Sequence, residues 1–278
     1  MRLDAHQHFW QHDPVRANWI TEDMTAIRRD FAPADLRPLL AAHGLGGCVV
    51  VQANQSEVEN DFQLAHAAWH DFIKGLVSWV DLQAADVSEC LIYYQQCKQL
   101  KSFRHVLQGE ADRALMLRPA FRRGIAALAA GGFTYDMLIL PDQLGGAREL
   151  VVAFPYQHFV LDHLAKSPIR KQQRAEWEAG LRALAAHENV WCKVSGLVTE
   201  ADWHRWQPAN FRPYLDVVFD AFGAARTVFG CEGPVCEVAG GYAAVVSLAW
   251  QYVAALSDRE QALFWGETAI DFYQLSVS

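Results

Sequence analysis

The sequence predicts one α/β domain over residues 1–278, built as a closed (β/α)8 or TIM barrel. Three observations lead to this fold class. Eight apolar, β-branched segments alternate with stretches of helical periodicity. Each strand-like segment is almost continuously apolar, which is typical of parallel strands buried on both faces. The length of 278 residues suits a single barrel of this kind.

The strands and helices are expected in strict alternation along the chain. The strands are expected at Leu3–Phe9, Gly47–Gln52, Gly75–Leu82, Leu100–Leu107, Phe133–Leu140, Phe159–Leu164, Val190–Leu197 and Thr227–Gly230. The clearest helices are expected at Pro33–Leu40, Arg122–Ala130, Arg174–His187, Tyr214–Phe222, Ala243–Leu256 and Asp258–Tyr273. The first of these has a proline in its first turn and a glycine stop at Gly44, a pairing that favours a helix between them.

An open, doubly wound sheet is the alternative architecture. Such a sheet normally carries a glycine-rich phosphate loop after its first strand, and this chain has none there. No linker, repeat or low-complexity segment divides the sequence. We therefore favour the closed barrel.

Composition narrows the class of protein. Hydrophobic residues make up 52% of the chain and charged residues 20%, as expected for a folded globular domain. The net charge of −8, with no basic cluster, argues against nucleic acid and membrane surfaces as partners. No apolar run is long enough to span a membrane, and no secretory signal is visible, so we expect a cytoplasmic protein. Six cysteines without a Cys-x-x-Cys pair are expected to be reduced thiols. The oligomeric state stays open.

The first strand contains a His-x-His pattern, His6 and His8. Residues two apart on a strand point to the same face, so both imidazoles can meet at one metal ion or one substrate oxygen. Catalysis in a (β/α)8 barrel takes place at the C-terminal ends of the strands. Polar residues gather at those ends in this chain, which favours an enzyme. They are His6, His8, Gln52, Asn54, Trp79, Asp81, Arg104, His105, Gln108, Tyr135, Asp136, Asp162, His163, Lys193, Ser195 and Glu232.

Taken together, these motifs resemble the amidohydrolase superfamily, and most of all its sugar-acid lactonase branch, the L-fuconolactonase and L-rhamnonolactonase group. The resemblance runs from residue 3 to about residue 273. It is carried by the His-x-His, Phe103-Arg104-His105, Leu161-Asp162-His163, Cys192-Lys193-Val194-Ser195-Gly196-Leu197, the segment from Gly196 to Trp203, and Phe229-Gly230 through Cys236.

This resemblance implies an amidohydrolase-type barrel that opens a lactone ring with a carboxylate-activated water. It places His6, His8 and His163 at the centre, with Arg104 on the substrate carbonyl or hydroxyls. The strand-eight carboxylate of the family falls at Glu232, which becomes the expected base. The chain departs from the family there: where Gly-Ser-Asp-Trp-Pro-Val is usual, it has Glu232 for the aspartate and Gly233 for the tryptophan.

Lactone hydrolysis needs an activated water and a stabilised oxyanion. We expect no required cofactor, with Zn²⁺ as the alternative and His6, His8 and Glu232 as its candidate ligands. The candidate substrate-binding residues are Gln52, Trp79, His105, Tyr135 and Lys193. Asp162 is expected to face away from the centre if its neighbour His163 faces in.

Three functions stay open at this point. The first is hydrolysis of a sugar-acid lactone such as L-fuconolactone, with that small molecule as the partner. The second is a metal-dependent amidohydrolase or decarboxylase on the same barrel. The third is a catalytically weakened sugar-acid-binding protein, which the Glu232 and Gly233 departures would allow.

Overall fold

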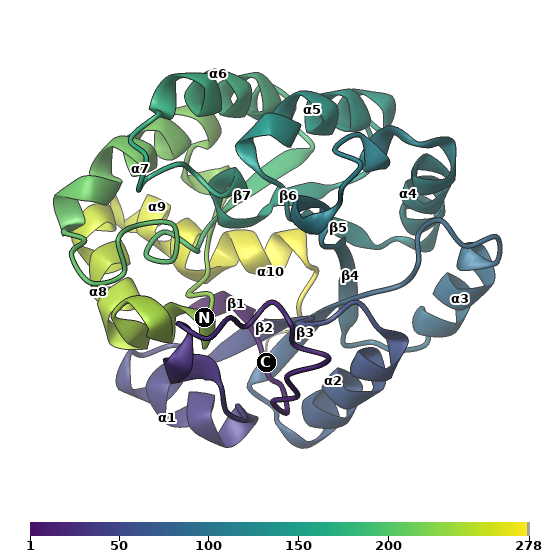
Figure 1. Ribbon diagram of the computed structural model, residues 1–278, viewed down its shortest axis with the longest axis horizontal. Coiled ribbons are helices and arrows are strands. Elements are labelled where there is room, and N and C mark those ends of the chain that lie inside the picture. The colour runs from purple at the N-terminus through teal and green to yellow at the C-terminus, as the bar shows by residue number, and fades with distance from the viewer. Residues whose placement is uncertain (277–278) are drawn as a thin grey trace.

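The computed structural model describes residues 1–276 and shows a ring of eight parallel strands inside a ring of helices (Figure 1). The strands follow chain order around the sheet. They are β1 (Leu3–Gln7), β2 (Gly47–Val51), β3 (Ile73–Ser78), β4 (Leu100–His105), β5 (Thr134–Met137), β6 (Phe159–Leu161), β7 (Val190–Val194) and β8 (Thr227–Phe229). The predicted (β/α)8 fold class is therefore confirmed, although positions 277 and 278 of the predicted domain lie outside the described residues.

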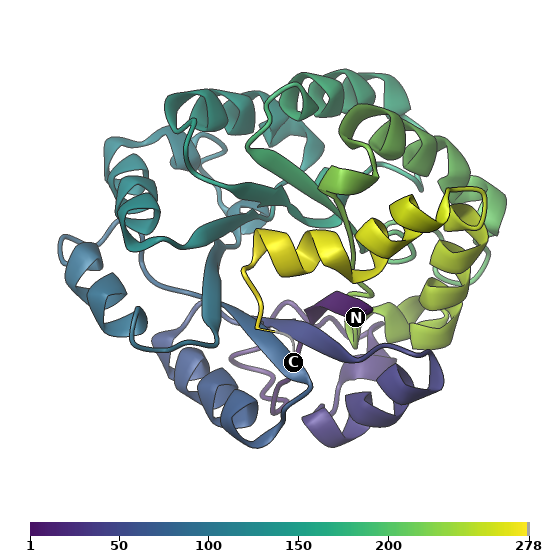
Figure 2. The same ribbon diagram turned by 180° about the vertical axis from the view of Figure 1, so that it is seen from behind.

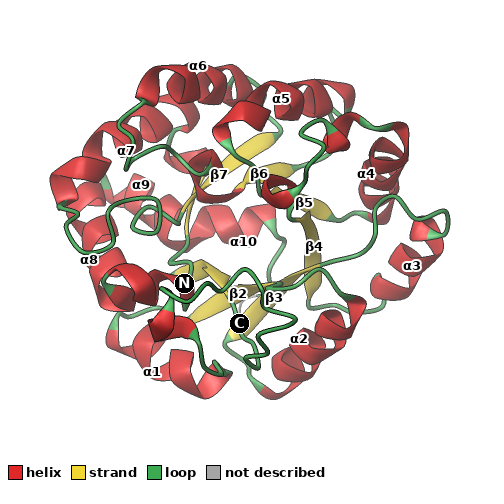
Figure 3. Cartoon of the chain, in the orientation of Figure 1, coloured by secondary structure: helices red, strands yellow, loops and turns green. Residues whose placement is uncertain are grey.

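Helices separate consecutive strands and cover the outside of the sheet (Figure 3). The helices between strands are α1 (Pro33–Ala42), α2 (Glu57–Trp69), α3 (Val87–Tyr94), α4 (Pro119–Gly131), α5 (Leu144–Ala153), α6 (Arg174–Ala185) and α7 (Pro208–Phe222). After β8 come α8 (Gly241–Val253), α9 (Asp258–Ala262) and α10 (Thr268–Phe272). The expected helix Asp258–Tyr273 is interrupted, because a π-helical turn at Leu263–Glu267 separates α9 from α10. Within residues 1–276, no helix has both the length and the apolar character that crossing a membrane requires.

The barrel closes between β1 and the segment that follows β8. Gln7 pairs in parallel with Gly233. The His8 amide donates to the Gly233 carbonyl at 2.7 Å, and the Glu232 amide donates to the His6 carbonyl at 3.0 Å. Closure therefore places Glu232 directly beside the His-x-His.

The N-terminal end of the barrel is plugged by α10, which crosses behind the strands in Figure 1 and in front of them in Figure 2. Its Ala269 and Phe272, with Tyr273 just after it, pack into an apolar cluster. The strand members of this cluster are Leu3, Ala5, Val49, Val51, Val77, Val160 and Val228. The interior of the barrel is thus a packed apolar core at the N-terminal ends of the strands, and the polar side chains lie toward the C-terminal ends.

Several strands are shorter than the apolar patterns predicted. The third ends at Ser78 rather than Leu82, the fifth at Met137 rather than Leu140, and the seventh at Val194 rather than Leu197. The additional apolar residues are buried in the strand-to-helix loops, where Leu82, Ile139 and Leu197 belong to the core between sheet and helices. Apolar character reports burial, so it does not distinguish the last strand residue from a buried loop residue.

Candidate active site

The imidazoles of the His-x-His gather with a third histidine at the centre of the barrel. The ring centroids of His6 and His8 are 4.9 Å apart, and those of His6 and His163 are 4.4 Å apart. His8 Nδ1 lies 2.8 Å from the Val51 carbonyl oxygen, which can only accept. The proton of neutral His8 is therefore on Nδ1, and Nε2 carries a lone pair.

Four charged side chains lie around His6, fully buried or nearly so. Arg104 donates to Asp162 at 2.9 Å. The Lys193 ammonium lies 3.1 Å from Asp162, 2.5 Å from Asp136 and 3.3 Å from His6 Nδ1. Two cations and two carboxylates balance, which is what makes burial of all four tolerable.

His6 lies between the two cations of this group. Its Nδ1 faces Lys193 at 3.3 Å and its Nε2 faces Arg104 Nη1 at 3.3 Å. Burial, reinforced by these cations, lowers the pKa of His6 to about 3, although Asp162 opposes the shift. His6 is therefore neutral at physiological pH, and only one of its two ring nitrogens can accept a hydrogen bond at a time.

Asp162 faces the barrel centre, contrary to the expectation that it would face away. Strand alternation fails here because β6 ends at Leu161, and the next turn runs through the left-handed region. The φ angles are +52° at His163, +53° at Leu164, +54° at Ala165 and +49° at Lys166. This turn brings Asp162 and His163 to the same side. Burial would raise the pKa of Asp162, but the positive charges of Lys193 and Arg104 outweigh burial and hold that pKa well below its usual value.

His163 links the central cluster to Glu232. Its Nδ1 lies 2.8 Å from the Ser195 hydroxyl, and its Nε2 lies 3.3 Å from Glu232 Oε1. Burial holds the pKa of His163 well below its ordinary value. A neutral imidazole that accepts from Ser195 at Nδ1 can donate its Nε2 proton to the carboxylate.

Glu232 is a buried carboxylate with partners on both oxygens. Lys166 Nζ lies 3.2 Å from Oε1, and the Thr199 hydroxyl donates to Oε2 at 2.8 Å. Lys166 is shared with Glu200, at 3.1 Å. Burial raises the pKa of Glu232, while Lys166 and Thr199 oppose the rise. An elevated carboxyl pKa is a property of general bases that work near neutral pH.

The Gln7 side chain fills the space beside Gly233. A Cβ atom on Gly233 would lie 2.5 Å from Gln7 Oε1. The Gln7 amide is itself held at 2.5 Å by Asp4, whose burial raises its pKa to about 6. In this chain Gln7 therefore takes the place beside the backbone where a larger residue at 233 would have to lie.

The five candidate substrate-binding residues lie in three different places. Lys193 is in the central cluster, and the Gln52 carbonyl accepts from Arg104 at 2.6 Å. Trp79 and His105 form a pair further out, with the Trp79 indole N–H 3.4 Å from His105 Nδ1. Tyr135 packs outward between strands and helices, with its ring 6.1 Å from that of Phe121 and 6.2 Å from that of Phe159. It is separated from the cluster by the sheet itself.

The donor set of the centre suits a zinc ion in type and spacing. Ligand atoms of His6, Asp162 and His163 lie within 4.8 Å of one another. Nitrogen and carboxylate donors are ordinary zinc ligands. However, Arg104 and Lys193 already neutralise Asp162 from two sides, so a cation would have to enter beside two positive charges.

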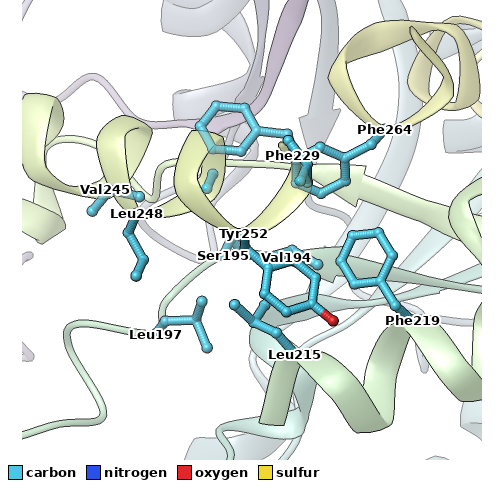
Figure 4. Close-up of a pocket in the computed structure, with 12 residues that line it drawn as sticks. Val194, Ser195, Leu197, Leu215, Phe219, Phe229, Val245, Leu248, Tyr252 and Phe264 are labelled. Atoms are coloured by element: carbon cyan, nitrogen blue, oxygen red, sulfur yellow. The ribbon is translucent and has the colours of Figure 1, made fainter. Parts of the chain in front are cut away.

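A small cavity lies behind Ser195, between β7, β8, α7 and α8 (Figure 4). Its volume is about 10 Å³, and apart from Ser195 and the Tyr252 hydroxyl its lining is apolar. A space of that size holds at most one water molecule. It is a packing gap between the barrel and its helices and not a substrate site.

Sequence reasoning passed over several residues that complete the site. Lys166 and Thr199 contact Glu232, but they lie in loops that no periodicity places. Asp136 is anchored by the Ser102 hydroxyl at 2.6 Å and by Tyr273 at 2.8 Å. Tyr273 reaches the site from the plug beneath the barrel. Asp136 was already among the polar residues expected at the strand ends, whereas Ser102 gave no distinct signal, because β4 also contains Lys101, Arg104 and His105.

The fold and the site together define a class of protein. A closed parallel barrel with histidines, paired charges and a buried carboxylate at the C-terminal ends of its strands is an enzyme-type barrel. The chain belongs to the amidohydrolase family, whose model matches residues 3–275.

Relatives resemble the chain over nearly its whole length. It is 38% identical to the L-fucono-1,5-lactonase of Burkholderia multivorans, over 99% of this chain and 96% of that protein. It is 34% identical to the L-fucono-1,5-lactonase of Burkholderia ambifaria, with the same coverage of both chains. A crystal structure of an amidohydrolase from B. multivorans with bound zinc superposes with a TM-score of 0.95 at 38% identity, covering 99% of this chain and 100% of that one.

Proposed function

We propose that this protein hydrolyses a sugar-acid lactone of the L-fucono-1,5-lactone type. The observation that carries the proposal is the buried Glu232 beside neutral His163, whose ring lies 4.4 Å from that of His6, the histidine that contacts the Arg104 and Lys193 cations. A base on one side and positive charge on the other is what addition of water to an ester carbonyl requires. The two lactonase relatives support the choice of substrate class.

In the proposed reaction Glu232 takes a proton from water while the water oxygen forms a bond to the lactone carbonyl carbon. The carbonyl electrons move to oxygen, and the Arg104 guanidinium stabilises the resulting oxyanion. Collapse of this intermediate breaks the bond between carbon and ring oxygen. The ring oxygen takes the proton that Glu232 received from water. The product is therefore an open-chain hydroxy acid, and the Glu232 carboxylate is regenerated.

Lys166 and Thr199 keep the Glu232 carboxylate oriented for this transfer. His163 donates to the same carboxylate and moves the proton no further, because its low pKa disfavours the imidazolium. Were Zn²⁺ bound, His6, Asp162 and His163 would hold it and it would supply Lewis-acid polarisation of the carbonyl.

The test is hydrolysis of L-fucono-1,5-lactone, followed by acid release, with and without a chelator. Turnover in both conditions supports the proposed function with protein groups alone. Turnover that chelation abolishes and Zn²⁺ restores supports a metal-dependent hydrolase on this barrel. Binding of the sugar acid without turnover of the lactone would overturn the proposal in favour of a binding protein.

A further inference from the structure

A groove opens beside the site, between the β6–α6 and β7–α7 loops. Its volume is about 1830 Å³, larger than the roughly 300–1,000 Å³ of an ordinary small-molecule pocket, and it is open to solvent on one side. Lys166 and Thr199 line it. The same two residues contact Glu232, at 3.2 and 2.8 Å. The inner end of the groove is therefore one hydrogen bond away from the proposed base.

The charges that line the groove indicate what it can hold. Five basic and five acidic side chains face it, so their sum is zero. A phosphate or nucleic-acid site would show an excess of positive charge. Interspersed donors and acceptors without net charge suit hydroxyl groups, because each hydroxyl both donates and accepts.

Two half-buried tryptophans add an apolar face to this polar groove. The Trp203 indole N–H donates to the Thr199 carbonyl at 2.9 Å, and that of Trp206 donates to the Ala239 carbonyl at 2.8 Å. Both N–H groups are thus engaged within the protein, so the two rings contribute apolar surface to the groove that they line. A flat apolar surface beside alternating donors and acceptors matches a sugar, which has C–H faces and hydroxyl edges.

We propose that this groove binds the polyhydroxylated part of the substrate, with Trp203 as the stacking surface and specificity-determining residue. Lys166 and Thr199 form the wall that the groove shares with the Glu232 carboxylate. This inference rests on the proposed function, because it assigns the sugar end of the lactone whose carbonyl end is attacked beside Glu232.

The kinetic test compares three variants. Trp203→Ala is expected to raise KM for L-fucono-1,5-lactone about ten-fold and leave kcat within about three-fold, since stacking acts on bound substrate and transition state alike. Trp203→Phe loses the bond to Thr199 but keeps an aromatic face, so KM near that of the wild type is expected. Trp69→Ala is the matched control, because Trp69 lies on α2 with 86% of its surface exposed. A folded Trp203→Ala with unchanged KM would overturn the proposal, as would Trp203→Phe as defective as the alanine variant.

A second measurement needs no variant and no turnover. Saturating L-fuconate, the stable open-chain acid, is expected to slow amide hydrogen exchange at 199–206 and leave 87–94 on α3 unchanged. Absence of slowing at 199–206 with bound L-fuconate would rule out the groove as its site. Slowing in a protein that fails to hydrolyse the lactone would retain the groove and reject the proposed function, so the two failures are distinguishable.

Discussion

Replacing Glu232 by glutamine tests the proposed base with little change of shape. In the wild type, Oε1 faces Lys166 and His163, and Oε2 accepts from Thr199. The glutamine amide can place its oxygen toward Lys166 and its NH₂ toward the Thr199 hydroxyl, which can also accept. The hydrogen-bond pattern around the side chain is thus largely preserved, whereas the ability to take a proton from water is lost.

The expected magnitudes follow from these contacts. Lys166 retains Glu200 at 3.1 Å, so loss of the Glu232 charge should lower the free energy of unfolding by only about 1–3 kcal/mol. Turnover should fall roughly 100-fold or more, as for loss of a general base. Glu232→Asp withdraws the carboxylate by about one C–C bond, roughly 1.5 Å. A displacement of that size can cost on the order of 100-fold, so we expect a clear loss for aspartate as well.

The assay is initial-rate acid release from L-fucono-1,5-lactone, combined with a thermal melt of each variant. Glu89→Gln, an exposed glutamate in the first turn of α3, serves as the matched control and should keep wild-type turnover. Full activity of folded Glu232→Gln would refute the assignment of the base. Gly233→Trp should not rescue Glu232→Asp, because its Cβ would meet the Gln7 side chain at 2.5 Å.

Three further predictions concern charge, metal and pH. Lys193→Met should lower the free energy of unfolding by about 3–5 kcal/mol in a denaturant titration, because it leaves the Asp136 carboxylate buried without its cation; a loss below 1 kcal/mol would contradict this. Dialysis against a chelator should leave turnover within about two-fold of the starting value, because Arg104 and Lys193 supply the positive charge; loss that Zn²⁺ restores would contradict it. The free energy of unfolding should decrease as the pH falls below about 6.5, by up to about 1.4 kcal/mol per pH unit for each of His6, His8 and His163. The reason is that their pKa values are lowered in the fold, so they bind protons in the unfolded chain first. Buried carboxyls with raised pKa values, Asp4 at about 6 together with Glu232 and Asp136, oppose this trend as the pH falls. The histidine contribution is therefore checked by NMR titration of the imidazoles, and a central histidine that titrates near pH 6.5 in the folded protein would contradict it.

The sequence predicted the parts of the site that strand alternation governs. Apolar runs located all eight strands, and residues two apart on a strand share a face, which is why His6 and His8 were expected together. The reasoning failed at Asp162, where the chain leaves the strand. Four successive left-handed residues follow it, and no local pattern in Leu161-Asp162-His163-Leu164 announces them. Alternation carries no information beyond the last strand residue.

Contacts between distant segments were also beyond sequence reasoning. Lys166 meets Glu232 across 66 positions, and Tyr273 meets Asp136 across 137. Such pairs are set by how two loops fold over the barrel or how a terminal helix enters it. Neither contact leaves a periodic trace in the chain.

The hydrogen bond from Tyr273 to Asp136 bears on how the protein can be made in the cell. Asp136 holds Lys193, and Lys193 holds the carboxylate beside His6, so the charge balance of the site runs from the first strand to the segment after α10. A ribosome delivers these parts in order, and domains fold as units once their sequence is available. Until Tyr273 has left the ribosomal tunnel, the N-terminal end of the nascent barrel is not covered by α10, and Asp136 lacks one of its hydrogen-bond donors. The active site is therefore assembled after translation of this segment, and not progressively as each strand emerges.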